Sequence, residues 1–159
     1  MLSSLCQSCG LCCSGALFTF LPVTAAEAER LVPLGVRTEA RRDGRTALLL
    51  PCAVLAGTRC GAYEQRPARC REYVCELGKA VERRERPVDA ALAIIAEAKR
   101  ELEELESLLG AREAGDVRST LQRAQQLEAT EPDDVRFKAV RAKARAVEAM
   151  LQQYFVGPY

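Results

Sequence analysis

Eight cysteines lie within the first 75 residues of this 159-residue chain, none follows, and the chain has no histidine. Four of the eight fall in the stretch CQSCGLCC at residues 6–13. Thiols this dense predict a disulfide framework, a redox-active pair of thiols or a metal site. The eight candidates are Cys6, Cys9, Cys12, Cys13, Cys52, Cys60, Cys70 and Cys75.

Disulfides fit this pattern poorly. The Cα atoms of neighbours such as Cys12 and Cys13 lie ~3.8 Å apart, below the ~4.4–6.8 Å usual for a bridge. The start MLSSLCQSCG lacks the basic and long apolar segments of a secretory signal. We therefore expect a cytoplasmic protein, in which structural disulfides are rare. A redox pair at Cys6 and Cys9 lacks the thioredoxin-like βαβ context.

A metal explains the cysteines best, because zinc and iron–sulfur clusters both accept four thiolates. Cys6-x-x-Cys9-x-x-Cys12 matches the opening of a ferredoxin run, but Cys13 follows at once and the usual last spacing is missing. In extended backbone Cys12 and Cys13 would point in different directions and could serve different centres. The sequence thus predicts either two four-cysteine sites or one such site with auxiliary thiols.

Arginines crowd the second cysteine segment. Their guanidinium groups could offset the negative charge of a thiolate centre and donate N–H···S hydrogen bonds. The alternative is that they are simply solvated. The predicted cofactor-binding set is Arg59, Arg66, Arg69 and Arg71.

The pattern along the chain predicts an α+β fold in two parts. Residues 1–80 should form a small, irregular, cysteine-rich metal-binding domain with short strands at 16–23 and 46–50. Thr24 with Glu27 is a capping box that begins a short helix, and Asp43-Gly44 predicts a hairpin turn. From Pro51 to Cys75 we expect loops, with one helical turn after Pro67.

Residues 81–159 should form an α-helical hairpin or a three-helix region. Apolar residues at three- and four-residue steps predict a long helix over 88–109. After a turn between Gly110 and Gly115, a second helix is expected from Val117 to about residue 128. A third should start at 131–133 and reach 154. Such faces suit a protein partner or a homo-oligomer as well as packing within one chain.

Charge and hydropathy exclude two classes of partner. The net charge of +1 gives no sign of nucleic-acid binding. No apolar run approaches the ~18 residues of a membrane span. We expect neither nucleic acid nor membrane as a partner.

Two motifs carry a family resemblance: CQSCGLCC at 6–13 and CGAYEQRPARCREYVC at 60–75. They resemble the CxxCxxCC cysteine-cluster family (YkgJ-like), whose members are described as zinc- or iron-chelating domains. The resemblance covers roughly residues 5–77 and includes all eight cysteines, with Cys52 where the family has one ahead of its Arg-Pro motif. It implies metal binding. Related clusters occur in flagellin lysine methylases, which resemble this chain only in the cysteine motifs.

Three functions stay open from the sequence. We favour a thiolate-ligated iron–sulfur centre (4Fe-4S) in a redox or accessory role. The alternative is a structural zinc domain whose helices mediate protein–protein interaction. An enzyme using S-adenosylmethionine ranks last, because the chain has no histidine, no G-x-G-x-x-G, no P-loop and no C-x-x-x-C-x-x-C. No catalytic residue is predicted.

Overall fold

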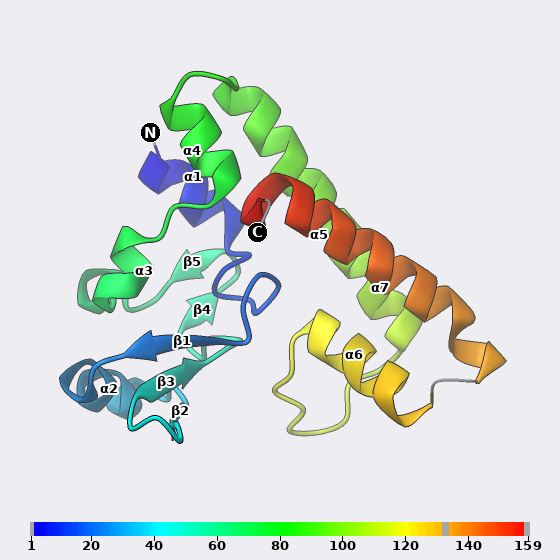
Figure 1. The fold of residues 1–159 in the computed structure, drawn as a ribbon, viewed down its shortest axis with the longest axis horizontal. Coiled ribbons are helices and arrows are strands. Elements are labelled where there is room, and N and C mark those ends of the chain that lie inside the picture. The colour runs from blue at the N-terminus through cyan, green and yellow to red at the C-terminus, as the bar shows by residue number, and fades with distance from the viewer. Residues whose placement is uncertain (1, 132–133, 158–159) are drawn as a thin grey trace. The chain divides into compact units, whose positions relative to one another are not determined.

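The computed structural model has an α+β fold and describes residues 2–131 and 134–157 (Figure 1). Backbone contacts divide the chain into two compact units, Ser3–Val74 and Cys75–Tyr159. Among the described residues, the first unit holds every strand and seven of the eight cysteines. The second unit is helical and holds Cys75.

The first unit combines short helices with two small antiparallel sheets. Its helices are α1 (Leu2–Cys9), α2 (Ala25–Leu31) and α3 (Ala68–Glu72), with single 3-10 turns at Val32–Leu34 and Tyr63–Gln65. Its strands are β1 (Phe20–Val23), β2 (Thr38–Ala40), β3 (Thr46–Leu49), β4 (Leu55–Ala56) and β5 (Arg59–Cys60). The three-stranded sheet has the order β1-β3-β2, and β4 with β5 forms a separate ribbon.

Several local predictions for this unit are confirmed. The Thr24–Glu27 capping box begins α2, with the Thr24 side chain accepting from the Glu27 N–H. Asp43 and Gly44 turn the chain between β2 and β3, and Gly44 has φ 77°, which glycine adopts without strain. The strand expected over 16–23 forms only at Phe20–Val23, where β1 pairs with β3.

The apolar core of this unit lies between α2 and the three-stranded sheet. Cys52 and Cys60 are partly buried and pack against it. Two candidate ligands therefore sit at the border of the apolar interior, where a charge is poorly solvated. The core residues are Val23, Ala28, Leu31, Val36, Leu48, Leu50 and Ala62.

Two sequence expectations for the cysteine segments need correction. Cys12 and Cys13 lie in a turn after α1, not in extended backbone, because the chain reverses over residues 11–15. The segment from Pro51 to Cys75 contains the predicted helical turn, α3, but also the unpredicted β4–β5 ribbon. Strands of two residues are too short to leave an alternating pattern in the sequence.

The second unit consists of four helices: α4 (Glu76–Glu82), α5 (Val88–Leu109), α6 (Thr120–Thr130) and α7 (Lys138–Leu151). A 3-10 turn at Val135–Phe137 precedes α7, and a π-helical turn at Gln152–Val156 follows it. The bounds predicted for α5 are confirmed, whereas α4 was not predicted. The predicted start of the third helix at 131–133 falls partly on residues 132 and 133, outside the described residues.

Helix α6 begins later than its apolar pattern suggests. Ser119 accepts from the Gln122 N–H, and the Gln122 side chain accepts from the Ser119 N–H. This reciprocal capping box stops the helix from extending back to Val117. The pattern of apolar residues located the helix, and the capping chemistry set its first residue.

Helices α5, α6 and α7 pack together as the predicted three-helix region, with α5 and α7 side by side (Figure 1). No helix among the described residues has the length and apolar character needed to cross a membrane. The buried apolar side chains of these helices are Ala91, Ile95, Ala98 and Leu105 from α5, Leu121 and Ala124 from α6, and Val140, Ala144, Val147 and Leu151 from α7.

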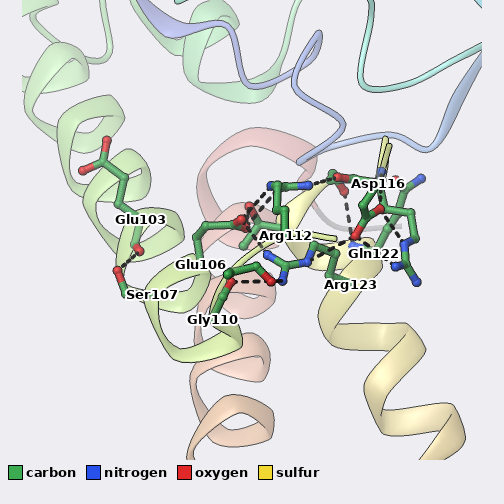
Figure 2. A network of polar contacts seen from close by, with 12 residues as sticks. Glu103, Glu106, Ser107, Gly110, Arg112, Asp116, Gln122 and Arg123 are labelled. Atoms are coloured by element: carbon green, nitrogen blue, oxygen red, sulfur yellow. Dashed lines mark hydrogen bonds and ion pairs between the residues drawn. The ribbon is translucent and has the colours of Figure 1, made fainter. Parts of the chain in front are cut away.

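Polar side chains fasten the loop between α5 and α6 (Figure 2). Arg123 of α6 donates to Glu106 of α5 at 2.6 Å and to the Gly110 carbonyl at 3.1 Å. Asp116 in the loop accepts from Arg118 and lies 3.5 Å from Arg123. Arg123 and Asp116 are largely buried, with side chains 9% and 4% exposed. The network is therefore largely buried and holds the loop in place.

Candidate metal centre

Four cysteines from four separate segments of the first unit act electrostatically on one another. Cys13 lies in the turn after α1, Cys52 follows the cis Leu50–Pro51 peptide, Cys60 is in β5 and Cys70 is in α3. We call Cys13, Cys52, Cys60 and Cys70 the thiol quartet.

Backbone hydrogen bonds fix three members of the quartet. The Cys52 N–H donates to the Cys13 carbonyl at 2.8 Å, which ties the two segments directly. The Leu55 N–H donates to the Cys52 carbonyl at 3.0 Å, and Leu55 pairs with Cys60 across the β4–β5 ribbon. The spacing of these three thiols thus follows from main-chain structure.

The quartet thiols are close enough to interact electrostatically. Burial, with smaller contributions from negative charge on Cys52, Cys60 and Cys70, raises the pKa of Cys13 from its ordinary value of 9.0 to about 12. Burial, followed by smaller effects of Cys52 and Cys60, likewise raises the pKa of Cys70, to about 11. The pKa of Cys52 is raised too, first by burial. At neutral pH, without a metal, these three thiols are protonated.

Arg66 supplies positive charge to this group. Its guanidinium lies 3.6 Å from the centre of the Tyr63 ring, and its Nε donates to the Tyr63 carbonyl at 2.9 Å. Held there, Arg66 lowers the pKa of both Cys13 and Cys70, against the larger effect of burial. The predicted role of Arg66, offsetting negative charge at the thiols, is thus supported by its effect on Cys13 and Cys70.

The other predicted arginines lie elsewhere. Arg59 and Arg69 are exposed, and the exposed Arg71 donates to the Arg66 carbonyl at 2.8 Å. Arg71 thus supports the backbone of Arg66.

Arg37, which the sequence analysis missed, lowers the pKa of Cys52 and donates to the Pro51 carbonyl at 3.3 Å. It precedes Cys52 by 15 positions and belongs to no cysteine motif. No local signal in the sequence marks it, because only the fold brings this residue, directly before β2, next to Pro51.

The remaining cysteines fall outside the quartet. Cys6 and Cys9 lie three residues apart on α1, and Cys12 follows in the turn. Cys75 belongs to the second unit, where it caps α4 and its Sγ accepts from the Gly78 N–H at 3.4 Å. Burial raises the pKa of Cys75 as well. No disulfide joins any of the eight cysteines, all of which lie in the described part of the chain.

The chemistry of the quartet fits a thiolate-ligated metal, since zinc and iron–sulfur clusters both take four cysteine sulfurs. Across residues 2–131 and 134–157, no three His, Cys, Asp or Glu side chains converge closely enough to hold an ion as they stand. The quartet is therefore identified by its donor type and mutual electrostatic effects, not by a finished coordination shell.

Comparison with protein families agrees with this donor set. Residues 5–91, more than half of the chain, match the CxxCxxCC family model, described as "Putative zinc- or iron-chelating domain". The chain belongs to the CxxCxxCC family. This confirms the family predicted from the two cysteine motifs and, at the level of zinc or iron chelation, the metal-binding function. The CxxCxxCC match extends past residue 77, through α4 into the first turn of α5. Comparisons with curated proteins and with solved structures found no match.

Proposed function

We propose that this CxxCxxCC protein holds an iron–sulfur cluster (4Fe-4S), in a redox or accessory role, through Cys13, Cys52, Cys60 and Cys70. The observation that carries the proposal is the electrostatic grouping of these four thiols from separate segments, two of which, Cys52 and Cys60, pack against an apolar core. A set made only of thiols suits iron–sulfur chemistry, and the ferredoxin-like run from Cys6 to Cys12 adjoins it.

Charge balance supports a centre at this place. Four thiolates around a zinc ion or an oxidised four-iron cluster leave a net charge near −2, which is costly at the edge of an apolar core. Arg66 brings positive charge to Cys13 and Cys70, and Arg37 brings it to Cys52. Both arginines lower the pKa of the thiols on which they act, and this favours the thiolate form that binds a metal.

The eight cysteines then divide into the quartet and a remainder of Cys6, Cys9, Cys12 and Cys75. Within the remainder, the first three follow one another on α1 and the turn after it. These thiols serve either a second centre or an auxiliary role.

A second function has a specific observation in its favour. Helices α5 to α7 and their connections leave Leu92, Leu108, Val117 and Val135 exposed by 40% to 81%. Apolar side chains left in water are typical of surfaces that contact another protein or a second copy. In this alternative the metal is a structural zinc, and the helical unit mediates the protein–protein interaction.

Anaerobic purification followed by metal and acid-labile sulfide analysis distinguishes the two functions. Iron with stoichiometric sulfide and a broad absorption band near ~400 nm supports the iron–sulfur centre. Colourless protein with one or two zinc ions per chain supports the structural domain. Protein that takes up neither metal under reducing conditions contradicts both.

A further inference from the structure

Glu27 binds two separate segments of the first unit at once. Its Oε2 accepts from the Thr24 N–H at 2.8 Å and contacts the Thr24 hydroxyl at 3.0 Å, which completes the capping box of α2. Its Oε1 accepts from the Ala68 N–H at 2.7 Å, 41 residues further along the chain. The capping box requires only the contacts with Thr24. The hydrogen bond from Ala68 therefore serves to join α2 to a second segment.

Ala68 is the first residue of α3, the five-residue helix that carries Cys70. The N–H groups of a first helical turn have no partner within the helix. Pro67, at the N-cap, makes no side-chain capping bond. The Glu27 carboxylate therefore supplies the acceptor that the start of α3 lacks, two residues before a quartet thiol.

The other end of α3 is also anchored. Tyr73, at its C-cap, packs edge-on against Phe18 with ring centres 5.0 Å apart and an interplanar angle of 88°. A single turn of helix has little stability of its own. These two contacts, one polar at its start and one aromatic at its end, therefore help to fix its position.

We propose that Glu27 is a positioning residue for the metal centre, fixing α3 through the Ala68 N–H so that Cys70 faces Cys13, Cys52 and Cys60. The inference rests on the proposed assignment of the quartet as metal ligands. Glu27 is not itself a ligand in this account, because both of its carboxylate oxygens are occupied by the hydrogen bonds above.

The direction in which metal affinity changes when Glu27 is neutralised distinguishes a positioning role from an electrostatic one. The negative charge of the Glu27 carboxylate disfavours a nearby thiolate by like-charge repulsion. If charge were what mattered, neutralising Glu27 would favour the Cys70 thiolate and strengthen metal binding. A positioning role predicts the opposite result, weaker metal binding.

Three variants of the full chain test the proposal. Glu27→Gln offers only one acceptor oxygen and cannot serve both segments. Ala68→Pro deletes the N–H alone, since proline suits the first helical position and Pro67 already has the extended ψ of 154° that a following proline requires. Thr24→Ala is the matched control, because it removes the capping hydroxyl but leaves the Glu27–Ala68 bond in place.

The measurement is the Zn²⁺ affinity of the reduced apoprotein by competition with a chromophoric chelator. A second readout is protection of Cys70 from alkylation, followed by mass spectrometry at saturating zinc. We expect E27Q and A68P to bind zinc about 10- to 100-fold more weakly, as loss of a ligand-orienting contact does. Both variants should also expose Cys70 more than Cys13, while T24A behaves like the wild type.

Wild-type affinity in both E27Q and A68P, or tighter binding in E27Q, would overturn the positioning role while leaving the quartet intact. Equal weakening in T24A would also overturn it, because general destabilisation would then explain the loss. Absence of zinc binding by the wild type would overturn the quartet assignment and this inference together.

Discussion

Gly10 touches the backbone of Thr58 so closely that no side chain fits between them. A Cβ atom at Gly10 would lie 3.0 Å from the Thr58 Cα and 3.3 Å from its carbonyl oxygen. Gly10 also has φ +72°, a conformation that other residues adopt only at a cost. The contact joins the cysteine loop that leads to Cys13 with the β4–β5 turn that precedes Cys60.

Gly10→Ala should therefore weaken both the fold and the metal site. The left-handed backbone alone costs about 1–2 kcal/mol with any other residue, and the Thr58 backbone must also move away. We expect a lower urea midpoint for the first unit and a lower Zn²⁺ affinity. Gly35→Ala is the control, since Gly35 has φ +82° but nothing lies within 4 Å of the position that its Cβ would take. Equal zinc affinities of G10A and G35A would contradict this role of the Thr58 contact.

Arg66→Gln should weaken metal binding by removing a positive charge from the quartet. Arg66 lowers the pKa of Cys13 and Cys70, so its loss raises both pKa values and makes the thiolates harder to form. The expected result is several-fold weaker Zn²⁺ binding and slower alkylation of both cysteines at pH 8. Arg69→Gln is the matched control, because Arg69 lies in the same cysteine segment, two residues after Pro67, but has an exposed side chain. Identical behaviour of R66Q and R69Q would show that Arg66 is merely solvated.

Metal binding should release protons, because the apoprotein holds its thiols in the neutral form. The pKa values of about 12 for Cys13 and about 11 for Cys70 lie far above neutrality. Each thiol must lose its proton to become a ligand, so apparent Zn²⁺ affinity should rise with pH. Between pH 6 and 8 we expect the logarithm of affinity to rise with a slope approaching about four. Calorimetry in buffers of different ionisation enthalpy measures the protons directly, and release of fewer than two per zinc would contradict four-thiolate binding.

The helical unit should lose stability in strong acid through Asp116. Hydrogen bonds from Arg118 lower the pKa of Asp116 from 3.8 to about 2. A carboxylate whose pKa is lower in the folded state stabilises the fold fully above the unfolded pKa, and this contribution disappears as pH falls through the folded value. Stability should therefore drop between about pH 4 and pH 2, as followed by amide exchange in α5 and α6. Asp116→Asn should make that part of the pH dependence shallower, and an unchanged profile would contradict the assignment.

Features set by local chemistry were predictable from the sequence. The Thr24–Glu27 box, the Asp43-Gly44 turn and the apolar repeat of residues 88–109 each act over a few residues, and all three form as expected. The cysteine motifs led to the family because their spacing is itself the family signature.

Features that depend on the tertiary fold were not predictable. The β4–β5 ribbon has two residues per strand, so no period could indicate it. Arg37 and Glu27 reach the quartet segments only after α2 and the sheet have packed, and neither lies in a cysteine motif. The same holds for the grouping of Cys13 with thiols 39 or more positions away, which spacing along the chain could not specify.

The central claim is that Cys13, Cys52, Cys60 and Cys70 form one ligand set. The most direct test purifies C13S, C52S, C60S and C70S anaerobically and analyses them for metal, sulfide and visible absorption, with Cys75→Ser alongside as the control. We predict that the four quartet variants share one defect, loss of the same centre, and that C75S keeps that centre, because Cys75 belongs to the second unit. Retention of the centre in any quartet variant, or its loss to the same extent in C75S, would contradict the claim.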